Sequence, residues 1–351
     1  MSYEYGMAAL NLEMPPRIPR TEYSATEHWP LVEAVTGIAA DPADKQLCEK
    51  ARRKFVEIWH YDLMWNTLIS GNEFGNFITR MGHAVYAANG ADFDREVSEL
   101  FANPEDAYDF DFYESLGAKD CSGLVRRFDE NYDAMAAAYP DMVNMTGVYI
   151  TCMSGLIDLL GWEALLVAAG LDGKRFGDLA DRYAKWIEQY YIALSKCKSP
   201  VVMVHDDIVW TSGAFISPDW YRRHIFPNYK MLFRHLHEAG KKIIYTSDGD
   251  YTEFVDDIAG CGVNCFVLEP LTDMAYIAER YGKTHSFIGN ADTRVLLAGS
   301  KDDIYNEVKR CVGIGKNCPG FFMAVGNHIP ANTPVDNALY YNDAYEKLCR
   351  R

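Results

Sequence analysis

The chain has 351 residues, 49% of them apolar, which is enough for one large domain with a substantial core. It carries 34 Lys and Arg against 50 Asp and Glu, and the resulting net charge of −16 argues against duplex nucleic acid or an anionic membrane surface as the main ligand. A small molecule or another protein is the expected partner, and nine cysteines without paired spacing indicate reduced thiols in the cytoplasm.

The first third of the chain contains few regular patterns. Its opening residues lack the basic start and apolar core of a signal peptide. Residues 17–24 (RIPRTEYS) and a run within residues 62–70 predict one strand each. The turn signals GNEFG and NGADF between Asn66 and Phe93 predict a hairpin or a lid.

From about residue 141, strand-like runs alternate with helix-like ones. Residues 219–240 (DWYRRHIFPNYKMLFRHLHEAG) have apolar residues at helical spacing and end on a capping Gly240. Residues 156–171 (LIDLLGWEALLVAAGL) predict a buried helix, because they are shorter than the ~20 residues that a membrane span needs. Six runs predict strands: Val143–Thr151, Pro200–Trp210, Lys241–Asp250, Val263–Pro270, Thr284–Thr293 and Gly320–His328.

The alternation of strand and helix implies parallel strands that are joined by crossover helices. With the two earlier runs, the later runs make eight predicted strands. This count and the chain length predict an α/β protein, a (β/α)8 TIM barrel with an elaborated N-terminal segment, in a single domain over residues 1–351. The predicted lid then lies over the mouth of the barrel.

Polar side chains end nearly every predicted strand. In a (β/α)8 barrel the carboxyl ends of the strands carry the chemistry, so these side chains are candidates for function. They are Glu22, His205, Asp206, Asp207, Asp248, Asp250, Glu269, Asn290, Asp292, Asn327 and His328. Their convergence on one face predicts an active site there.

Several of these carboxylates also have a structural interpretation. Asp250, more than Asp248, suits a cap for the helix that begins near Tyr251, because Asp is a preferred N-cap and DGD is turn chemistry. One of Asp206 and Asp207 can serve only to hold the loop through backbone hydrogen bonds.

The later strand ends have similar alternatives. Glu269 precedes Pro270, which holds Glu269 in an extended conformation. A salt bridge is a more expected role for Glu269 than catalysis. Asp292 suits a turn or a pairing with Arg294, and His328 can be an ordinary loop histidine. Three other histidines fall in the predicted helix at spacings that suit surface or packing positions: His224, His235 and His237.

The sequence lacks the strongest metal and phosphate signatures. It has no CxxC pair, no HExxH helix, no GxGxxG after a strand and no Walker sequence. The geometry of adjacent strand ends still allows a metal site whose ligands are His205, Asp248, Glu269 and His328. A second set, Asp292, Glu307 and His328, is less plausible because Glu307 falls in mid-helix, away from the mouth.

An ordered series of motifs resembles the uroporphyrinogen decarboxylase superfamily, over roughly Leu10 to Tyr345. The motifs are HDDIVWTSGAFISPDWYRRHIFPNYKMLFRHLHEAGKKIIYTSDGD, FVLEP, IGNADTRVLLAGSKDDIYNEVKR and GNHIPANTPVDN. The resemblance implies a (β/α)8 barrel with its site at the strand C-termini, in agreement with the strand count.

Two departures from the family patterns narrow the implied activity. Porphyrinogen decarboxylases carry an RQAGR-type motif that clamps the acidic tetrapyrrole. Here RIPRTEYSATEHWP places Glu22 and Glu27 where cations are wanted, so a carboxylate-rich substrate is expected to be repelled. Thiol-directed corrinoid methyltransferases carry a zinc-binding His-x-Cys and a later Cys. Those positions fall at Thr246, Asp248 and Asn327, so a thiol acceptor is not expected.

The chain then resembles the corrinoid-dependent methyltransferases that demethylate methoxylated aromatic compounds. This implies a cytoplasmic enzyme of anaerobic metabolism, an O-demethylase component, that moves the methyl group of an aryl methyl ether to cobalt(I) and releases a phenol. In this family the corrinoid (cobalamin) is carried by a partner protein. A zinc ion and a homo-oligomeric assembly are both compatible with the resemblance. Two alternative functions stay open. One is a uroporphyrinogen decarboxylase-like protein that binds a tetrapyrrole or a corrinoid, and the other is a methylcobalamin-dependent methyltransferase with another acceptor.

The implied chemistry assigns roles to the strand-end residues. A phenolate with a pKa of about 10 leaves more easily if it receives a proton or meets a Lewis acid. A carboxylic acid near other carboxylates has a raised pKa, so Asp248 is the expected acid, with His205, Glu269 and His328 as catalytic neighbours or, with zinc, as fellow ligands. The expected substrate pocket comprises Glu22, Tyr23, Tyr149, Asp207, Trp210, Tyr245 and Asn290, and core packing is the alternative for each aromatic residue.

Overall fold

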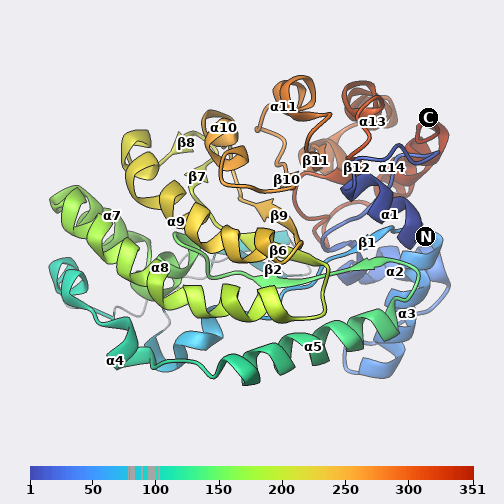
Figure 1. Ribbon diagram of the computed structural model, residues 1–351. Coiled ribbons are helices and arrows are strands. Elements are labelled where there is room, and N and C mark those ends of the chain that lie inside the picture. The colour runs from blue at the N-terminus through green and yellow to red at the C-terminus, as the bar shows by residue number, and fades with distance from the viewer. Residues whose placement is uncertain (78, 80–83, 88–89, 94–99, 102) are drawn as a thin grey trace.

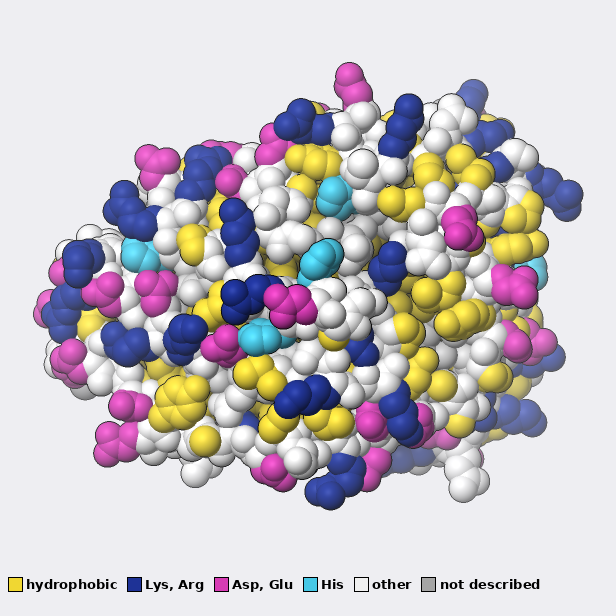
Figure 2. Space-filling view, in the orientation of Figure 1, with side chains coloured by type: hydrophobic (Ala, Val, Ile, Leu, Met, Phe, Trp, Pro, Cys, Tyr) yellow, Lys and Arg dark blue, Asp and Glu magenta, His cyan; other side chains and the backbone are white. Residues whose placement is uncertain are grey.

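A computed structural model of the chain describes residues 1–77, 79, 84–87, 90–93, 100–101 and 103–351 (Figure 1). The two ends of the chain lie close to each other in Figure 1, and Arg17 and Arg350 form an isolated antiparallel bridge. All nine cysteines are free thiols. The face in Figure 2 mixes Lys and Arg side chains with Asp and Glu side chains.

Six strands form a parallel sheet in the order β12-β11-β10-β9-β6-β5. A separate parallel pair joins β1 (Leu63–Met64) to β4 (Val143–Asn144), which directly precedes β5. The strands of the larger sheet are β5 (Thr146–Val148), β6 (Val201–His205), β9 (Lys242–Thr246), β10 (Cys265–Val267), β11 (Ser286–Ala291) and β12 (Phe321–Val325). Each lies within a run that the sequence predicts as a strand.

The segment around Arg20 lies between β12 and β1 and closes the sheet into a ring. The Met323 N–H donates to the Pro19 carbonyl (2.8 Å), and the Thr21 N–H donates to the Met323 carbonyl (3.2 Å). On the other side, the Asp62 N–H donates to the Arg20 carbonyl (2.8 Å). Eight strand segments therefore form the (β/α)8 barrel that the sequence predicts.

Alternate residues of each strand face the barrel interior, as the period of two in a strand requires. Helix α1 (Tyr3–Leu10) closes the end where the strands begin: Ser286 Oγ donates to the Ala9 carbonyl (2.9 Å). The interior cluster comprises Ala9, Leu10, Leu63, Val143, Met145, Val201, Met203, Ile244, Cys265, Ile288, Phe322 and Ala324. Because α1 fills this end, the opposite end of the barrel is the open one.

A layer of helices surrounds the barrel, and the larger hydrophobic core lies between helices and strands (Figure 1). The Asp172 side chain accepts the N–H groups of Lys174 and Arg175 (3.0 Å each) and so fixes the start of α8. The helices of the later two thirds are α8 (Gly173–Lys196), α9 (Pro218–Glu238), α10 (Val255–Ala259), α11 (Met274–Tyr281), α12 (Thr293–Ala298), α13 (Lys301–Gly315) and α14 (Val335–Leu348). Those of the elaborated N-terminal segment are α2 (Trp29–Thr36), α3 (Lys45–Ile58), α4 (Phe112–Leu116) and α5 (Cys121–Ala138).

The single helix predicted for residues 156–171 is wrong. Two helices, α6 (Ser154–Leu160) and α7 (Trp162–Leu171), meet there at 105°. Gly161 at the break has φ 76°, a left-handed conformation that glycine adopts without steric cost. Among the described residues, no single helix is both long and apolar enough to cross a membrane, and this bent pair meets that test only when its two helices are combined.

Short elements complete the fold. The predicted hairpin is confirmed in the antiparallel pair β2 (Ala84–Ala87) and β3 (Gly90–Phe93), whereas its role as a lid depends on residues outside the described ones and stays a prediction. A second hairpin, β7 (Val209–Trp210) and β8 (Gly213–Ala214), follows β6. The 3-10 helices are η1 (Ala25–Glu27), η2 (Gly71–Phe77), η3 (Pro104–Asp109) and η4 (Thr252–Phe254).

Candidate active site

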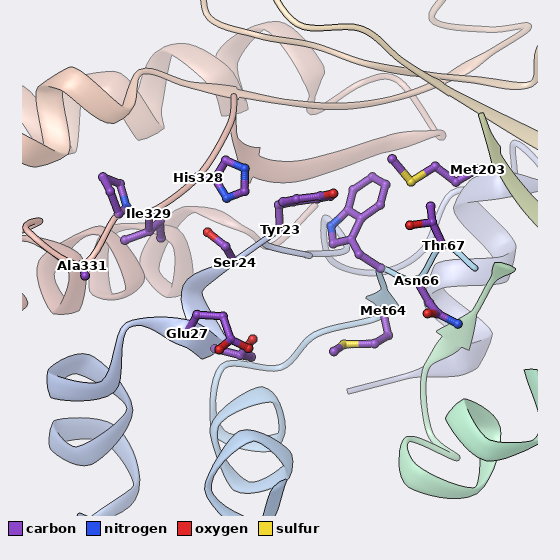
Figure 3. A pocket seen from close by; sticks show the side chains of 13 residues that line it. Tyr23, Ser24, Glu27, Met64, Asn66, Thr67, Met203, His328, Ile329 and Ala331 are labelled. Atoms are coloured by element: carbon purple, nitrogen blue, oxygen red, sulfur yellow. The ribbon is translucent and has the colours of Figure 1, made fainter. Parts of the chain in front are cut away.

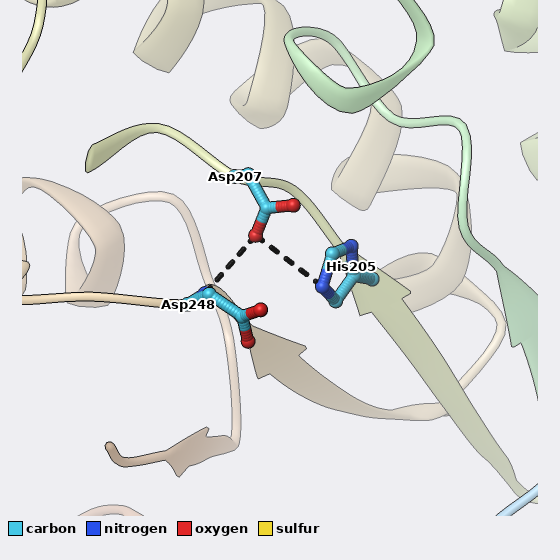
Figure 4. A group of neighbouring side chains, drawn as sticks. All are labelled: His205, Asp207 and Asp248. Atoms are coloured by element: carbon cyan, nitrogen blue, oxygen red, sulfur yellow. Dashed lines mark hydrogen bonds and ion pairs between the residues drawn. The ribbon is translucent and has the colours of Figure 1, made fainter. Parts of the chain in front are cut away.

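Three polar side chains meet at the open end of the barrel (Figure 4). His205 ends β6, Asp207 follows two residues later, and Asp248 follows β9, which pairs directly with β6. The His205 Nε2 atom lies 3.3 Å from Asp207 Oδ1, and the Asp248 N–H donates to the same oxygen (3.0 Å). For these three residues, the structure confirms that the strand ends converge.

Asp206 points away from the mouth and fixes the loop after β6. Its Oδ1 atom accepts the N–H groups of Met153 and Ser154 (2.7 and 2.6 Å), and Oδ2 accepts the Tyr229 hydroxyl (2.5 Å). Complete burial raises the pKa of Asp206 to about 7. Of the neighbouring carboxylates, Asp206 is therefore structural and Asp207 faces the site.

His205 is a buried side chain that is fixed by its neighbours. The Tyr149 ring stacks on the imidazole, with ring centroids 3.8 Å apart and planes 11° apart. The Ser154 hydroxyl lies 3.4 Å from His205 Nδ1 and accepts the Asp207 N–H (2.8 Å). Stacking and hydrogen bonding together hold Nε2 toward Asp207.

Asp248 occupies a narrow part of the mouth. Solvent reaches its side chain, but protein atoms surround it on most sides. This loss of hydration, together with the negative charges of Asp207 and Glu269, raises the pKa of Asp248 to about 8, although His205 opposes the shift. The raised pKa favours the protonated form of Asp248, which can donate a proton.

Glu269 is held near Asp248 by hydrogen bonds, and its influence there is through charge. The Gly249 N–H donates to Glu269 Oε2 (2.9 Å), and the Asn327 side-chain amide donates to Oε1. Gly249 has φ 88°, and a Cβ atom there would lie 2.5 Å from the Trp210 carbonyl oxygen, so this approach requires glycine. Among the described residues, Glu269 makes these hydrogen bonds rather than the salt bridge that the sequence favours.

Two other carboxylates have local structural roles, although the N-cap residue of the helix after Asp250 is Tyr251 and not Asp250 as predicted. Asp250 accepts the N–H and hydroxyl of Thr252 (3.0 and 2.6 Å), and Asp292 both accepts the Arg294 N–H (2.9 Å) and pairs with its guanidinium (2.7 Å). Glu307 lies in α13 as expected but is not remote from the strand ends. Its Oε1 atom accepts the Asp292 N–H (2.8 Å) at the end of β11.

Three adjoining pockets open at the mouth. The large pocket, of about 510 Å³, is lined by Tyr23, Glu27, Met64, Trp65, Met203, His328 and their neighbours (Figure 3). The inner pocket, of about 50 Å³, contains His205, Thr246 and Asp248 and shares Tyr23, Trp65 and His328 with the large pocket. The side pocket, of about 270 Å³, is lined by Glu269, Asp292, Arg294, Asn327, His328 and their neighbours. The large pocket has the size of a small-molecule site.

His328 separates the three pockets, because its side chain lines each of them. Tyr23 packs edge-on against the imidazole, with ring centroids 4.8 Å apart. Burial lowers the pKa of His328 to about 4, so this imidazole is neutral near pH 7. Burial and the charge of Asp248 raise the pKa of Tyr23. The wall between the large and inner pockets is therefore aromatic and uncharged.

The structure brings together a different metal set from the predicted one. Among the described residues, one ligand atom from each of His205, Asp207 and Asp248 lies within 4.8 Å of the others, whereas Glu269 and His328 are not in this group. One imidazole and two carboxylates with an open position fit a catalytic zinc ion. The three positions compared above with a His-x-Cys motif and a later Cys all line the inner pocket, but they supply neither imidazole nor thiolate; they are Thr246, Asp248 and Asn327.

Tyr245 and Asn290, expected in the substrate pocket, lie behind it instead. Tyr245 is buried under α9, with its hydroxyl 3.4 Å from that of Tyr229, because it is out of phase with the inward-facing Thr246. The Asn290 amide donates to the carbonyls of Glu269 and Thr272 (3.2 Å each), so its role is structural.

Trp210 is also displaced from the expected pocket. It lies on the β7–β8 hairpin and packs against Trp162 and Phe215, with ring centroids 5.6 and 5.4 Å away. It lines none of the three pockets at the mouth. Three of the predicted pocket residues, Tyr23, Tyr149 and Asp207, do lie at the site.

Glu22 is likewise a structural residue. Its fully buried carboxylate pairs with Arg20 (3.3 Å) and accepts the Tyr341 hydroxyl (2.7 Å) and the Val325 N–H (2.9 Å). The Arg20 guanidinium is equally buried and lies over the Trp59 ring, 4.3 Å from its centroid. Both charges are satisfied inside the protein, away from the mouth.

The predicted repulsion of acidic substrates cannot come from the buried Glu22, whereas for Glu27, which lines the large pocket, it stays a prediction. Glu22 is paired and buried, and Glu27 is paired with Arg52 (2.8 Å) at the edge of the large pocket. Among the described residues, the arginines of the first strand segment do not form a cationic clamp at the mouth. Arg17 pairs with Asp62 (2.7 Å), and Arg20 is enclosed, so neither arginine of the first strand segment serves the pockets.

Trp65 lines both the large and the inner pocket, and it is not among the residues predicted from the sequence. The signal for it is the period of two in a strand. Trp65 follows the inward-facing Leu63 by two positions and stands just beyond the end of β1, where a barrel places functional side chains.

Comparisons with known proteins agree with this architecture. The family model described as uroporphyrinogen decarboxylase (URO-D) matches residues 130–348. Uroporphyrinogen decarboxylases from Syntrophotalea carbinolica and Thermus thermophilus are 26% identical over 173 residues and 28% identical over 170 residues. These matches cover 49% and 48% of this chain. They also cover 49% and 48% of the two relatives, so the chain spans about half the length of the curated relatives it matches.

A solved structure extends the likeness to nearly the whole chain. A methyltransferase from Methanosarcina mazei superposes with a TM-score of 0.64 and 15% identity, and the match covers 98% of this chain and 97% of that one. At this identity the likeness concerns the fold. Since the family model covers more than half of the residues, the chain belongs to the uroporphyrinogen decarboxylase family.

Proposed function

We propose that the protein is a methyltransferase that takes the methyl group of a methoxylated aromatic compound, passes it to the cobalt of a corrinoid on a partner protein, and releases a phenol. The observation that carries this proposal is the position of the Asp248 carboxyl group, beside His205 and Asp207 and with a raised pKa, in an inner pocket that adjoins a large pocket with aromatic side chains in its wall. Proton donation in a pocket that accepts a ring is what the demethylation of an aryl ether needs.

The residues divide the work as follows. The methyl carbon bonds to cobalt(I), whose electron pair forms the new bond, while the bonding pair of the carbon–oxygen bond goes to the phenolic oxygen. Asp248 supplies the proton to that oxygen, which is otherwise a poor leaving group because phenol has a pKa of about 10. Asp207 and Glu269 keep Asp248 protonated, and solvent access allows it to regain a proton.

The similar fold of a methyltransferase from Methanosarcina mazei is compatible with a transferase, although the likeness concerns the fold alone. The family name and the relatives at 26% and 28% identity favour a second candidate, a uroporphyrinogen decarboxylase-like tetrapyrrole enzyme. The arginines of the first strand segment, however, are engaged inside the fold, which leaves an acidic tetrapyrrole without that clamp.

With a reduced corrinoid partner protein, guaiacol-like or vanillate-like compounds should give the methylated corrinoid and the free phenol, whereas methanol and methylamines should not. Apolar walls and a few polar groups are enough to hold such a ring. The spectrum of the corrinoid and chromatography of the phenol measure both products. Uroporphyrinogen serves as the comparison, and its decarboxylation, or methyl transfer from methanol, would contradict the proposal.

The donor set of His205, Asp207 and Asp248 also fits zinc, which when bound polarises a substrate oxygen as a Lewis acid. Because Asp248 can supply the proton, we expect methyl transfer to survive chelation. Metal analysis of the purified protein and assays after chelation test this. Stoichiometric zinc that is lost in His205→Ala but kept in His328→Ala, with activity that follows the metal, would instead show that zinc activates the ether.

A further inference from the structure

The side pocket, of about 270 Å³, has no part in the chemistry proposed above. Four loops form it: the turn between β7 and β8 and the segments that follow β10, β11 and β12. It adjoins the inner pocket, because Asn327 and His328 line both, and it opens to solvent at the exposed side chains of Thr211, Leu271 and Arg294. Pockets that enclose a whole small molecule measure roughly 300–1,000 Å³, so this smaller, open pocket suits one arm of a larger molecule.

The charged groups of the side pocket both donate and accept hydrogen bonds. Arg294 donates from Nε and Nη2 to Asp292 (2.9 and 2.7 Å), and its Nη1 group makes no hydrogen bond among the described residues. The two oxygens of Glu269 each accept one hydrogen bond, from Asn327 and from the Gly249 N–H, and a carboxylate oxygen has room for a second. Two carboxylates disfavour an anionic ligand, and the guanidinium disfavours a cationic one. A neutral primary carboxamide, which donates from nitrogen and accepts at oxygen, suits these groups.

The methyl acceptor of the proposed function is a larger molecule of this kind. A corrin ring carries acetamide and propionamide side chains around its rim, and its cobalt has to stand over the inner pocket to reach the methyl group. The rim then lies above the neighbouring strand ends, where the side pocket opens. His328 stands between the large pocket and the side pocket, so an aromatic ring and a corrin side chain have separate compartments.

We propose that the side pocket binds one carboxamide side chain of the corrin ring and so positions the cobalt over the inner pocket. The choice of a corrin as the ligand rests on the function proposed above. The amide oxygen accepts from Arg294 Nη1, and the amide N–H groups donate to the carboxylates of Glu269 and Asp292. Pro270 and Leu271, which also line the pocket, contact the methylene groups of the side chain.

The test compares two free corrinoids of equal charge, aquacyanocobinamide and the heptamethyl ester of aquacyanocobyrinic acid. The first carries amide side chains, whereas the second carries methyl esters, which have no N–H group to donate. In calorimetric titrations, the wild type should bind the cobinamide at least roughly fivefold more tightly than the ester. Arg294→Met removes the cation and should weaken binding of the cobinamide by roughly tenfold. Leu271→Trp fills the pocket and should make the two affinities equal.

Arg280→Met is the matched control, because Arg280 is also an exposed arginine that pairs with an aspartate, Asp256 (2.9 Å), but it lines none of the three pockets. This variant should bind the cobinamide as tightly as the wild type does. Leu271→Trp keeps the test decisive if Arg294→Met does not fold. Equal wild-type affinities for the two corrinoids, wild-type binding in the folded variants, or no binding of either corrinoid would overturn the inference. The expected binding pattern without methyl transfer would support the inference and contradict only the proposed demethylation.

Discussion

Asp248→Asn should preserve folding and lower methyl transfer by roughly 10²- to 10⁴-fold, the usual effect of losing general acid help. The asparagine keeps the size of the side chain and, through its backbone, the hydrogen bond to Asp207 (3.0 Å). It has no acidic proton for the departing oxygen. Single-turnover methylation of the corrinoid measures the step directly. Near-normal turnover in the folded variant would remove Asp248 from the mechanism.

The pH dependence provides an independent check on the same role. The pKa of Asp248 is raised to about 8 by loss of hydration in the narrow mouth and by the charges of Asp207 and Glu269, so the donating form predominates below that pH. Methyl transfer should therefore fall as the pH rises through about 8 and should lose this dependence in Asp248→Asn. Asp250→Asn is the matched control, because Asp250 holds only the turn at Thr252 (3.0 Å) and should keep the wild-type profile.

Glu22→Gln should lower the free energy of unfolding by about 3–5 kcal/mol, because it leaves the enclosed guanidinium of Arg20 without its counter-charge. Both side chains of this pair are 0% exposed, so water cannot replace the lost interaction. Urea denaturation, followed by circular dichroism, measures the change. This is the largest stability effect that we expect from removing one charge.

The control for this prediction is Glu27→Gln, which removes one partner of an exposed pair. The Glu27 side chain is 56% exposed, so solvent screens its pairing with Arg52, and its loss should cost less than about 1 kcal/mol. Replacing both members of the buried pair, as in Arg20→Met with Glu22→Leu, should recover part of the lost stability. Equal destabilisation by Glu22→Gln and Glu27→Gln would show that the buried pair adds nothing.

The barrel could be predicted because its signals are local. Each strand is a short apolar run that ends in polar residues. Such a run is buried on both faces and does not show which face points inward, so the prediction that Tyr245, rather than Thr246, lines the pocket is wrong. The break at Gly161 is local as well, and a glycine inside an apolar run is a reason to divide a predicted helix.

The site was harder to predict because its details depend on residues far apart in the sequence. Asp206 and Asp207 are equivalent until Met153 and Ser154, some 50 residues earlier, supply the N–H groups that take up Asp206. Glu22 became a structural residue through Tyr341, which is 319 positions away. Such choices follow from tertiary packing, and no local pattern encodes them.

The position of His328 affects how this barrel can diversify. One side chain forms a wall of all three pockets, with volumes of about 510, 50 and 270 Å³. A smaller residue at this position would merge separate compartments into one chamber, while Asp248 and the loop that carries it would stay in place. A single substitution thus offers an evolutionary route to bulkier substrates without rebuilding the chemistry, and the same position is the natural one to vary in engineering the substrate range.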